Sequence, residues 1–140
     1  MARVEVAGDR VAQIEAGILA LVGIEKGDGL PQCERMFERL VGYRIFPDEE
    51  NRMNLSVRDI QGGLLLVPQF TLAADTSSGM RPGFSTAAQP KDAESIFARL
   101  CEYASSNYAF VSKGIFAADM HIHLVNVGPV TFHLRCPPSL

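Results

Sequence analysis

The sequence predicts an α+β domain in which two helices pack on one side of mostly antiparallel sheets. Two observations predict this fold. Two segments carry apolar residues at every third or fourth position, as amphipathic helices do, and the rest of the chain holds short apolar runs separated by turn residues. The length of 140 residues suits a single core, so we expect one domain over residues 1–140.

The N-terminal third is expected to contain a hairpin, a buried strand and a helix. Residues 2–6 and 10–16 alternate around a Gly8-Asp9 turn, which favours a β-hairpin. Residues 17–23 are continuously apolar, as in a strand covered on both faces. Pro31 suits the first turn of a helix. The apolar stripe of that helix consists of Cys33, Met36, Phe37, Leu40 and Val41.

The middle of the chain is expected to hold three more strands and a long loop. Short strands are expected at residues 43–46 and 53–57, on either side of a polar turn. After Gly62-Gly63, residues 64–67 read as a buried strand that continues directly into residues 68–72. The polar loop over residues 73–89 exceeds the usual length of a connection, which indicates a functional or mobile segment.

The C-terminal part is expected to contain the second helix and the last strands. Pro90 begins this helix and Ser105-Ser106-Asn107 ends it. Its apolar face carries Ala93, Ile96, Phe97, Leu100, Cys101 and Ala104. Strands are expected at residues 108–111, 120–125 and 130–135. The last two are expected to pair as a hairpin around Asn126-Val127-Gly128-Pro129.

Composition narrows the classes of function. Hydrophobic residues make up 47% and charged residues 21% of the chain, as in soluble globular proteins. No apolar run approaches the roughly 18 residues of a membrane span, and the start lacks the profile of a signal peptide, so a cytoplasmic protein without a membrane partner is expected. The net charge of −3 argues against a protein that binds DNA or RNA along its length. The charge does not exclude a protein that inserts only the end of an RNA into a pocket.

The cysteines and histidines predict no metal site and no cofactor. Cys33, Cys101 and Cys136 are odd in number and widely spaced, which favours free thiols that fill the core. His121 and His123 share one face of a strand, and His133, across the predicted hairpin, leaves a zinc site open. A solvated or interface-facing strand surface is the favoured interpretation. Motifs for a serine nucleophile, a zinc protease or a phosphate loop are missing.

Two strand ends carry the candidate site residues. Proline cannot donate to a central ladder, so pairing is expected to stop at Pro68 and to leave the amides of Phe70 and Thr71 as free donors. The bond between Gly128 and Pro129 is of the kind that tolerates a cis peptide, which would fix the direction of two carbonyls. Spacing alone favours simpler interpretations of both segments. Residues 68–72 would be the end of an edge strand whose Thr71 hydroxyl caps a turn, and Gly128-Pro129 would be a trans hairpin turn.

At these residues the chain resembles the D-aminoacyl-tRNA deacylases, also called D-tyrosyl-tRNA deacylases. The family motif S-Q-F-T-L-x-A is matched by residues 68–74, and N-x-G-P-V-T by residues 126–131. Residues 79–84 match G-x-R-P-x-F, and residues 114–120 match G-x-F-x-A-x-M. Residues 40–46 and 53–57 are similar to the family as well. The likeness covers nearly the whole chain with its segments in the same order.

The resemblance implies a hydrolase that acts on the ester between a D-amino acid and the terminal ribose of tRNA. It implies a homodimer that uses neither cofactor nor metal, with Gln69, Phe70 and Thr71 lining the ester. Donors to the developing oxyanion and the vicinal ribose hydroxyl would supply the catalysis, so that the reaction is assisted by the RNA. Thr71 would position the substrate rather than attack it, since no base lies near it in the sequence.

The resemblance also implies how D- and L-amino acids are told apart. A cis Gly128-Pro129 turn from the partner subunit would hold the α-ammonium with its carbonyls and leave no space for an L side chain. Phe116 and Met120 would flank the adenosine or form the pocket wall, with Pro68 beside the substrate. Glycine has no side chain to exclude, so glycine misattached to alanine tRNA would be accepted too.

The sequence departs from the family pattern at two places. Pro68 replaces the usual serine, as in a related animal branch that removes misattached L-alanine with a trans Gly-Pro. That branch replaces the F of F-T-L and lacks the R-P-x-F loop, both of which are present here, so the D-specific interpretation is favoured. The family's usual first strand, with its Gln-Arg-Val signature, is missing, which implies a truncated start or a degenerate member. The alternatives are therefore the L-alanine branch and a non-catalytic dimer that binds tRNA ends or a small ligand.

Overall fold

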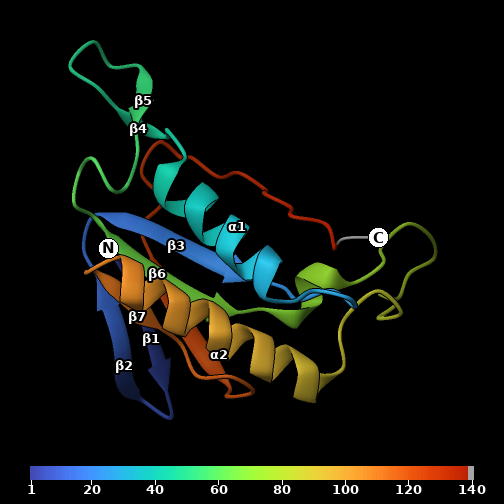
Figure 1. The fold of residues 1–140 in the computed structure, drawn as a ribbon. Coiled ribbons are helices and arrows are strands. Elements are labelled where there is room, and N and C mark those ends of the chain that lie inside the picture. The colour runs from blue at the N-terminus through green and yellow to red at the C-terminus, as the bar shows by residue number, and fades with distance from the viewer. Residues whose placement is uncertain (139–140) are drawn as a thin grey trace.

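A computed structural model describes residues 1–138 as three layers (Figure 1). The strands are β1 (Ala2–Val6), β2 (Asp9–Ile14), β3 (Gly17–Val22), β4 (Phe46–Pro47), β5 (Met53–Leu55), β6 (Gly63–Pro68), β7 (Val111–Lys113) and β8 (Met120–Leu124). The helices are α1 (Leu30–Gly42), α2 (Pro90–Asn107) and the short 3-10 helix η1 (Phe70–Ala73). The predicted α+β class is confirmed.

The central layer is a sheet with the strand order β3-β6-β7. Its middle strand, β6, has two buried faces because side chains alternate along a strand. Leu64 and Leu66 pack with α1 and α2, whereas Leu65 and Val67 pack with the sheet β2-β1-β8. Both helices therefore cover one face, as predicted, and an antiparallel sheet covers the other. The β4–β5 hairpin projects away from these layers (Figure 1).

The prediction of mostly antiparallel pairing is wrong for the central sheet. β3 pairs with β6 in parallel, from Gly17 opposite Gly63 to Val22 opposite Pro68, and β7 is parallel to β6 as well. The physical reason is that α1 and α2 each lie between two of these strands in the chain and act as crossovers, which parallel pairing requires. The prediction that residues 17–23 are covered on both faces is also wrong at Leu21, which is 43% exposed because β3 is an edge strand.

The two predicted helices are confirmed and form the larger part of the core. Phe37 of α1 is fully buried and its ring lies 5.4 Å from that of Tyr103 of α2. Burial of a side chain of this size stabilises the fold by about 1.5–3 kcal/mol. Cys33 and Cys101 are buried free thiols, and burial raises the pKa of each to about 11. They are core residues rather than reactive ones, as the sequence predicts.

The predicted strand at residues 130–135 is wrong. These residues form no strand and instead run along α1, where the Phe132 ring lies 5.9 Å from that of Tyr43 and Leu134 packs against the helical core. β8 pairs with β1 on one side, with Ile122 opposite Val4, and no strand among residues 1–138 pairs with its other side. The alternating apolar residues at 130–135 therefore pack against α1 and do not belong to a sheet. Asn126–Pro129 is consequently not a hairpin turn.

The histidines form no metal centre within residues 1–138. No group of three or more metal-ligating side chains lies together among these residues. His123 is exposed and its Nε2 lies 3.0 Å from Oε2 of Glu5 on the neighbouring strand. His133 lies on the segment along α1, so it does not face the other two across a hairpin. In this part of the chain, no helix is both long and apolar enough to cross a membrane.

Candidate functional site

The carboxyl ends of the three parallel strands meet at one edge of the central sheet. Gly23 follows β3, Gln69 follows β6 and Gly114 follows β7. This edge is where parallel sheets commonly bind ligands, since the strands end there and loops take over. The structure places Pro68, Gln69, Phe70 and Thr71 at this edge, and it brings Met120 to them from β8. It is our candidate site.

The chain leaves β6 by turning into η1, which frees two backbone donors. The amide of Gln69 still donates to the carbonyl of Val22 at 2.7 Å, and the amide of Leu72 already donates to Gln69 at 3.2 Å. Between them, the amides of Phe70 and Thr71 have no acceptor among residues 1–138. The expectation of free donors is thereby confirmed. The expectation of an edge strand is wrong, because a 3-10 turn begins at Phe70.

The hydroxyl of Thr71 is oriented by a neighbour rather than activated. Nε2 of Gln69 donates to Oγ1 of Thr71 at 2.7 Å, and both side chains are open to solvent. In the described part of the chain, no histidine, lysine or carboxylate is hydrogen-bonded to this hydroxyl. A threonine without a base is a weak nucleophile. The geometry therefore suits a positioning role for Thr71.

Two glycines allow the backbone to pack closely at the carboxyl edge. A Cβ at Gly23 would lie 3.0 Å from Cβ of Leu72 and 3.3 Å from the carbonyl oxygen of Gln69. A Cβ at Gly114 would lie 2.8 Å from Sδ of Met120 and 3.6 Å from Cδ of Pro68. From the sequence, Gly23 was only the last residue of the expected strand at 17–23, and Gly114 only the first residue of a family motif. The available signal was a glycine directly after a strand, Gly23 after β3 and Gly114 after β7, where a missing side chain permits close approach.

Met120 and Phe116 occupy different surroundings. Met120 is half-buried and its sulfur lies against Gly114 beside Pro68. Phe116 is also half-buried, with its ring 6.4 Å from that of Phe97 on α2, so it packs against the helical core. Met120 thus lies directly at the end of β6, and Phe116 lies at the border between this edge and the helices.

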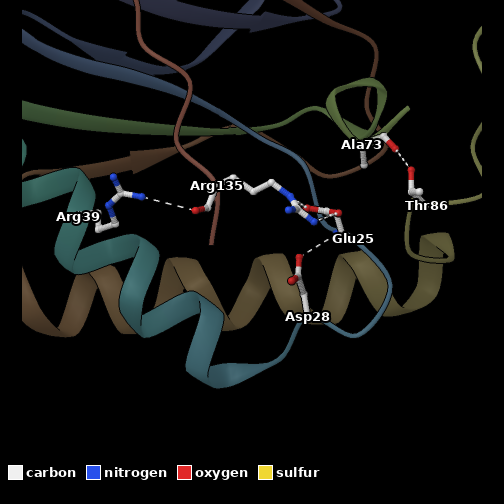
Figure 2. A network of polar contacts seen from close by, with 6 residues as sticks. All are labelled: Glu25, Asp28, Arg39, Ala73, Thr86 and Arg135. Atoms are coloured by element: carbon white, nitrogen blue, oxygen red, sulfur yellow. Dashed lines mark hydrogen bonds and ion pairs between the residues drawn. The ribbon is translucent and has the colours of Figure 1, made fainter. Parts of the chain in front are cut away.

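The long loop over residues 74–89 is fastened to η1 and to the turn before α1. The hydroxyl of Thr86 donates to the carbonyl of Ala73, the last residue of η1 (Figure 2). The amide of Lys26 donates to the carbonyl of Thr86 at 3.0 Å. The ring of Phe84, in the same loop, lies 5.4 Å from that of Phe70. Thr86 is therefore a supporting residue that sequence reasoning did not single out.

An ion pair joins this region to the C-terminal segment. Figure 2 shows the guanidinium of Arg135 facing the carboxylate of Glu25, with two hydrogen bonds of 2.8 Å. These bonds hold the pKa of the Glu25 carboxyl below its usual value. Oδ2 of Asp28 accepts the amide of Glu25 at 2.8 Å, whereas its Oδ1 is buried without a partner among residues 1–138. Burial raises the pKa of Asp28.

The Gly128-Pro129 turn is exposed and braced by Asn126. The peptide bond between Gly128 and Pro129 is cis, as the resemblance implies. Oδ1 of Asn126 accepts the amide of Val130 at 2.8 Å, and its Nδ2 donates to Oγ1 of Thr131 at 2.9 Å. Gly128 has a φ of +129°, a conformation that favours glycine.

Within one chain this turn lies far from Gln69–Thr71. The turn precedes Phe132, which contacts Tyr43 at the C-terminal end of α1. The η1 segment lies at the other end of α1, where Lys26 meets the long loop (Figure 1). A helix of this length measures about 20 Å. Two shallow hollows lie at the β4–β5 hairpin and between β2 and β7, and neither is lined by Gln69–Thr71. Phe70 and Thr71 are exposed, so the candidate site is open to solvent.

Known proteins match this chain over nearly its whole length. The family model for D-Tyr-tRNA(Tyr) deacylase matches residues 1–135. A protein of Alkalilimnicola ehrlichii named D-aminoacyl-tRNA deacylase is 56% identical over 138 residues, covering 99% of this chain and 92% of that protein. One of Methylococcus capsulatus with the same name is 57% identical, covering 99% and 90%.

Solved structures match as well. The c-Myc DNA Unwinding Element Binding Protein superimposes with a TM-score of 0.92 at 34% identity, covering 97% of this chain and 93% of that one. A probable eukaryotic D-amino acid tRNA deacylase superimposes with a TM-score of 0.72 at 12% identity, covering 87% of each chain. At that identity the second likeness concerns the fold alone.

Proposed function

Since this chain belongs to the D-Tyr-tRNA(Tyr) deacylase family, we propose that it releases D-amino acids from tRNA by hydrolysing their ester bond. It is a hydrolase in this proposal, working in the cytoplasm where aminoacyl-tRNA is used. The observation that carries the proposal is the pair of unpartnered amides, of Phe70 and Thr71, at the carboxyl edge of the central sheet. Two adjacent donors suit an ester oxygen that gains negative charge.

The ester itself needs little activation. Water adds to the carbonyl carbon, the carbonyl oxygen gains negative charge, and the amides of Phe70 and Thr71 donate to it. Removal of one such donor from an enzyme costs about 10²–10³ in kcat. The bond to the ribose oxygen then breaks, that oxygen takes up the proton that the attacking water gave up, and the free amino acid and tRNA leave. The vicinal ribose hydroxyl guides the water, which fits the lack of a base at Thr71.

The remaining side of the site comes, in this proposal, from a second copy of the chain. One chain holds Gly128-Pro129 and Gln69–Thr71 about one helix length apart, so they do not meet within it. A two-fold dimer supplies the turn of each subunit to the other. The carbonyls of Gly128 and Pro129 then bind the α-ammonium, and the turn occupies the place of an L side chain.

The other site residues bind the terminal nucleoside in this arrangement. Met120, packed against Gly114 and Pro68, forms the wall next to the ester. Phe116 contributes the part of its ring that α2 leaves uncovered. Glycine misattached to alanine tRNA passes the same selection, because it has no side chain for the turn to exclude. No cofactor or metal takes part in these steps.

Hydrolysis of four substrates by the purified chain tests the proposal. D-tyrosyl-tRNA and glycyl-tRNA should lose their amino acid, whereas L-tyrosyl-tRNA and L-alanyl-tRNA should not. Preference for L-alanyl-tRNA would assign the chain to the L-alanine branch, which also carries proline at the position of Pro68. No release from any ester at micromolar enzyme, with tRNA still bound, would leave a non-catalytic binding protein.

A further inference from the structure

Beside the free amides lies an exposed apolar surface that the proposed hydrolysis does not use. Phe70 is 61% exposed and Phe84 is 43% exposed, and their rings lie 5.4 Å apart at an angle of 43°. Met80, at the tip of the same loop, is 99% exposed. We call Phe70, Met80, Arg81 and Phe84 the loop platform. Its residues come from η1 and from the loop that extends beyond the sheet edge (Figure 1).

The platform is held at a fixed place relative to the ester-binding residues. Phe70 itself provides one of the two free amides, so its ring belongs to the same residue as one of the ester-binding donors. The loop is closed by two hydrogen bonds between Asp75 and Gly83, of 2.7 and 2.9 Å. It is also tied to the end of η1 by Thr86. An exposed apolar surface so close to a binding site and so well supported indicates a ligand contact.

Charge on the loop suits an anionic ligand. Arg81 makes no ion pair with a carboxylate of residues 1–138. Lys26, at the base of the loop, is likewise free of one in this part of the chain. The carboxylate of Asp75 is occupied locally, since it accepts the amide of Ser77 at 2.9 Å. Flat apolar faces next to free cations are the combination that binds single-stranded nucleic acid.

We propose that the loop platform binds the unpaired nucleotides that precede the terminal adenosine of tRNA. The proposal rests on the proposed function, because an ester held at Gln69–Thr71 fixes where the RNA strand continues. The terminal nucleoside lies against Met120 and Phe116, and the bases before it stack on Phe84 and Phe70. Met80 covers them from the loop tip, and Arg81 contacts their phosphates. Stacking of this kind accepts any base, as a platform used on many tRNAs requires.

Kinetics with substrates of increasing length test this proposal. D-tyrosyl-adenosine lacks the nucleotides that the platform binds, whereas D-tyrosyl-tRNA has them. Phe84→Leu should raise the ratio of the KM for D-tyrosyl-tRNA to that for D-tyrosyl-adenosine about tenfold, and Phe84→Tyr, which keeps the ring, should restore it. The matched control is Phe110→Leu, a 49% exposed phenylalanine at the opposite end of β6. An equal change in both KM values, or none, overturns the proposal.

Direct binding separates this proposal from the activity. The probe is a fluorescent RNA hairpin with an unpaired 3′ tail ending in CCA, compared by anisotropy with the same hairpin without a tail. Tail-dependent binding that weakens in Phe84→Leu supports the platform even if no ester is hydrolysed. Arg81→Gln should reduce the slope of log affinity against log salt by about 0.7. Hydrolysis of the ester together with binding that does not depend on the tail overturns the platform and leaves the proposed function intact. The platform is also overturned if the only defect of Phe84→Leu is loss of the dimer, measured by light scattering.

Discussion

Arg135 and Glu25 are joined by two hydrogen bonds of 2.8 Å although 110 residues separate them in the sequence. The pair fastens the C-terminal segment to the turn before α1. The same turn is bridged to Ala87, next to Thr86, and Thr86 is bonded to the end of η1. A continuous series of contacts therefore connects the segment that carries Gly128-Pro129 with the segment that carries Thr71. In the proposed dimer, these contacts would link each site to the other.

The first prediction concerns this ion pair. Glu25→Gln should lower Tm at pH 7 and increase amide hydrogen exchange over residues 130–138, because the bidentate charged contact is lost. The pKa of Glu25 is depressed by Arg135, so its stabilisation is present above the ordinary value of 4.5 and is lost as pH falls through the folded pKa. The difference in Tm between variant and wild type should therefore shrink as pH falls below 4.5 and vanish below the folded pKa. A difference that persists there would contradict the role of the charge.

Asp28 should behave in the opposite way. Burial raises its pKa, and Oδ1 has no partner in the described part of the chain, so the ionised form is costly at neutral pH. Its contribution to stability is present below the ordinary value of 3.8 and is lost as pH rises through the folded pKa. Asp28→Asn keeps an oxygen for the amide of Glu25 and should raise Tm at pH 7. A thermal melt at pH 7 that shows a lower Tm for Asp28→Asn would refute this account.

A third prediction separates positioning from nucleophilic attack at Thr71. Thr71→Val keeps the shape of the side chain and removes the hydroxyl that Gln69 holds. We expect kcat on D-tyrosyl-tRNA to fall about tenfold, whereas loss of a nucleophile that acts with a base costs up to about 10⁶. Gln69→Glu serves as the companion variant, because it removes the donor to Thr71 and should show a similar loss. A fall to the uncatalysed rate in Thr71→Val would assign the attack to threonine.

A fourth prediction uses the two glycines at the carboxyl edge. In Gly23→Ala the new methyl meets Leu72 at 3.0 Å and backbone atoms of η1, so η1 must move. Overpacking of this kind costs about 1–3 kcal/mol, and kcat should fall because the free amides move as well. In Gly114→Ala the methyl is too close only to the flexible end of Met120, while Pro68 lies at an ordinary contact distance, so KM should rise while kcat is kept. Steady-state kinetics and denaturant melts of both variants measure these effects.

The sequence predicted what depends on single elements and missed what depends on their arrangement. The periodicity of α1 and α2 is a property of each helix, and both were found. The run from Leu64 to Val67 suits either strand direction, so parallel pairing emerges only with the crossovers. The alternation at residues 130–135 fits a strand, yet α1 provides the contacts. Pro68 revealed the free amides because proline acts locally, whereas Gly23 and Gly114 matter only through distant neighbours.

The last prediction tests whether each site takes residues from two chains. Gly128→Ala forces a side chain into a φ of +129° and places its Cβ 2.8 Å from Cγ2 of Val130, a strain of about 1–3 kcal/mol in an exposed turn. Thr71→Arg fills the ester position of its own chain. Each variant alone should lose most of its activity on D-tyrosyl-tRNA.

In mixed dimers of these two variants, one site combines an intact Thr71 from the Gly128→Ala chain with an intact turn from the Thr71→Arg chain. An equal mixture forms such dimers half of the time, and each has one good site of two, so about a quarter of wild-type activity should return after subunit exchange. The measurement is hydrolysis of D-tyrosyl-tRNA by the mixture against each variant alone. If the turn and Gln69–Thr71 acted within one chain, the mixture would show only the average of the two variants.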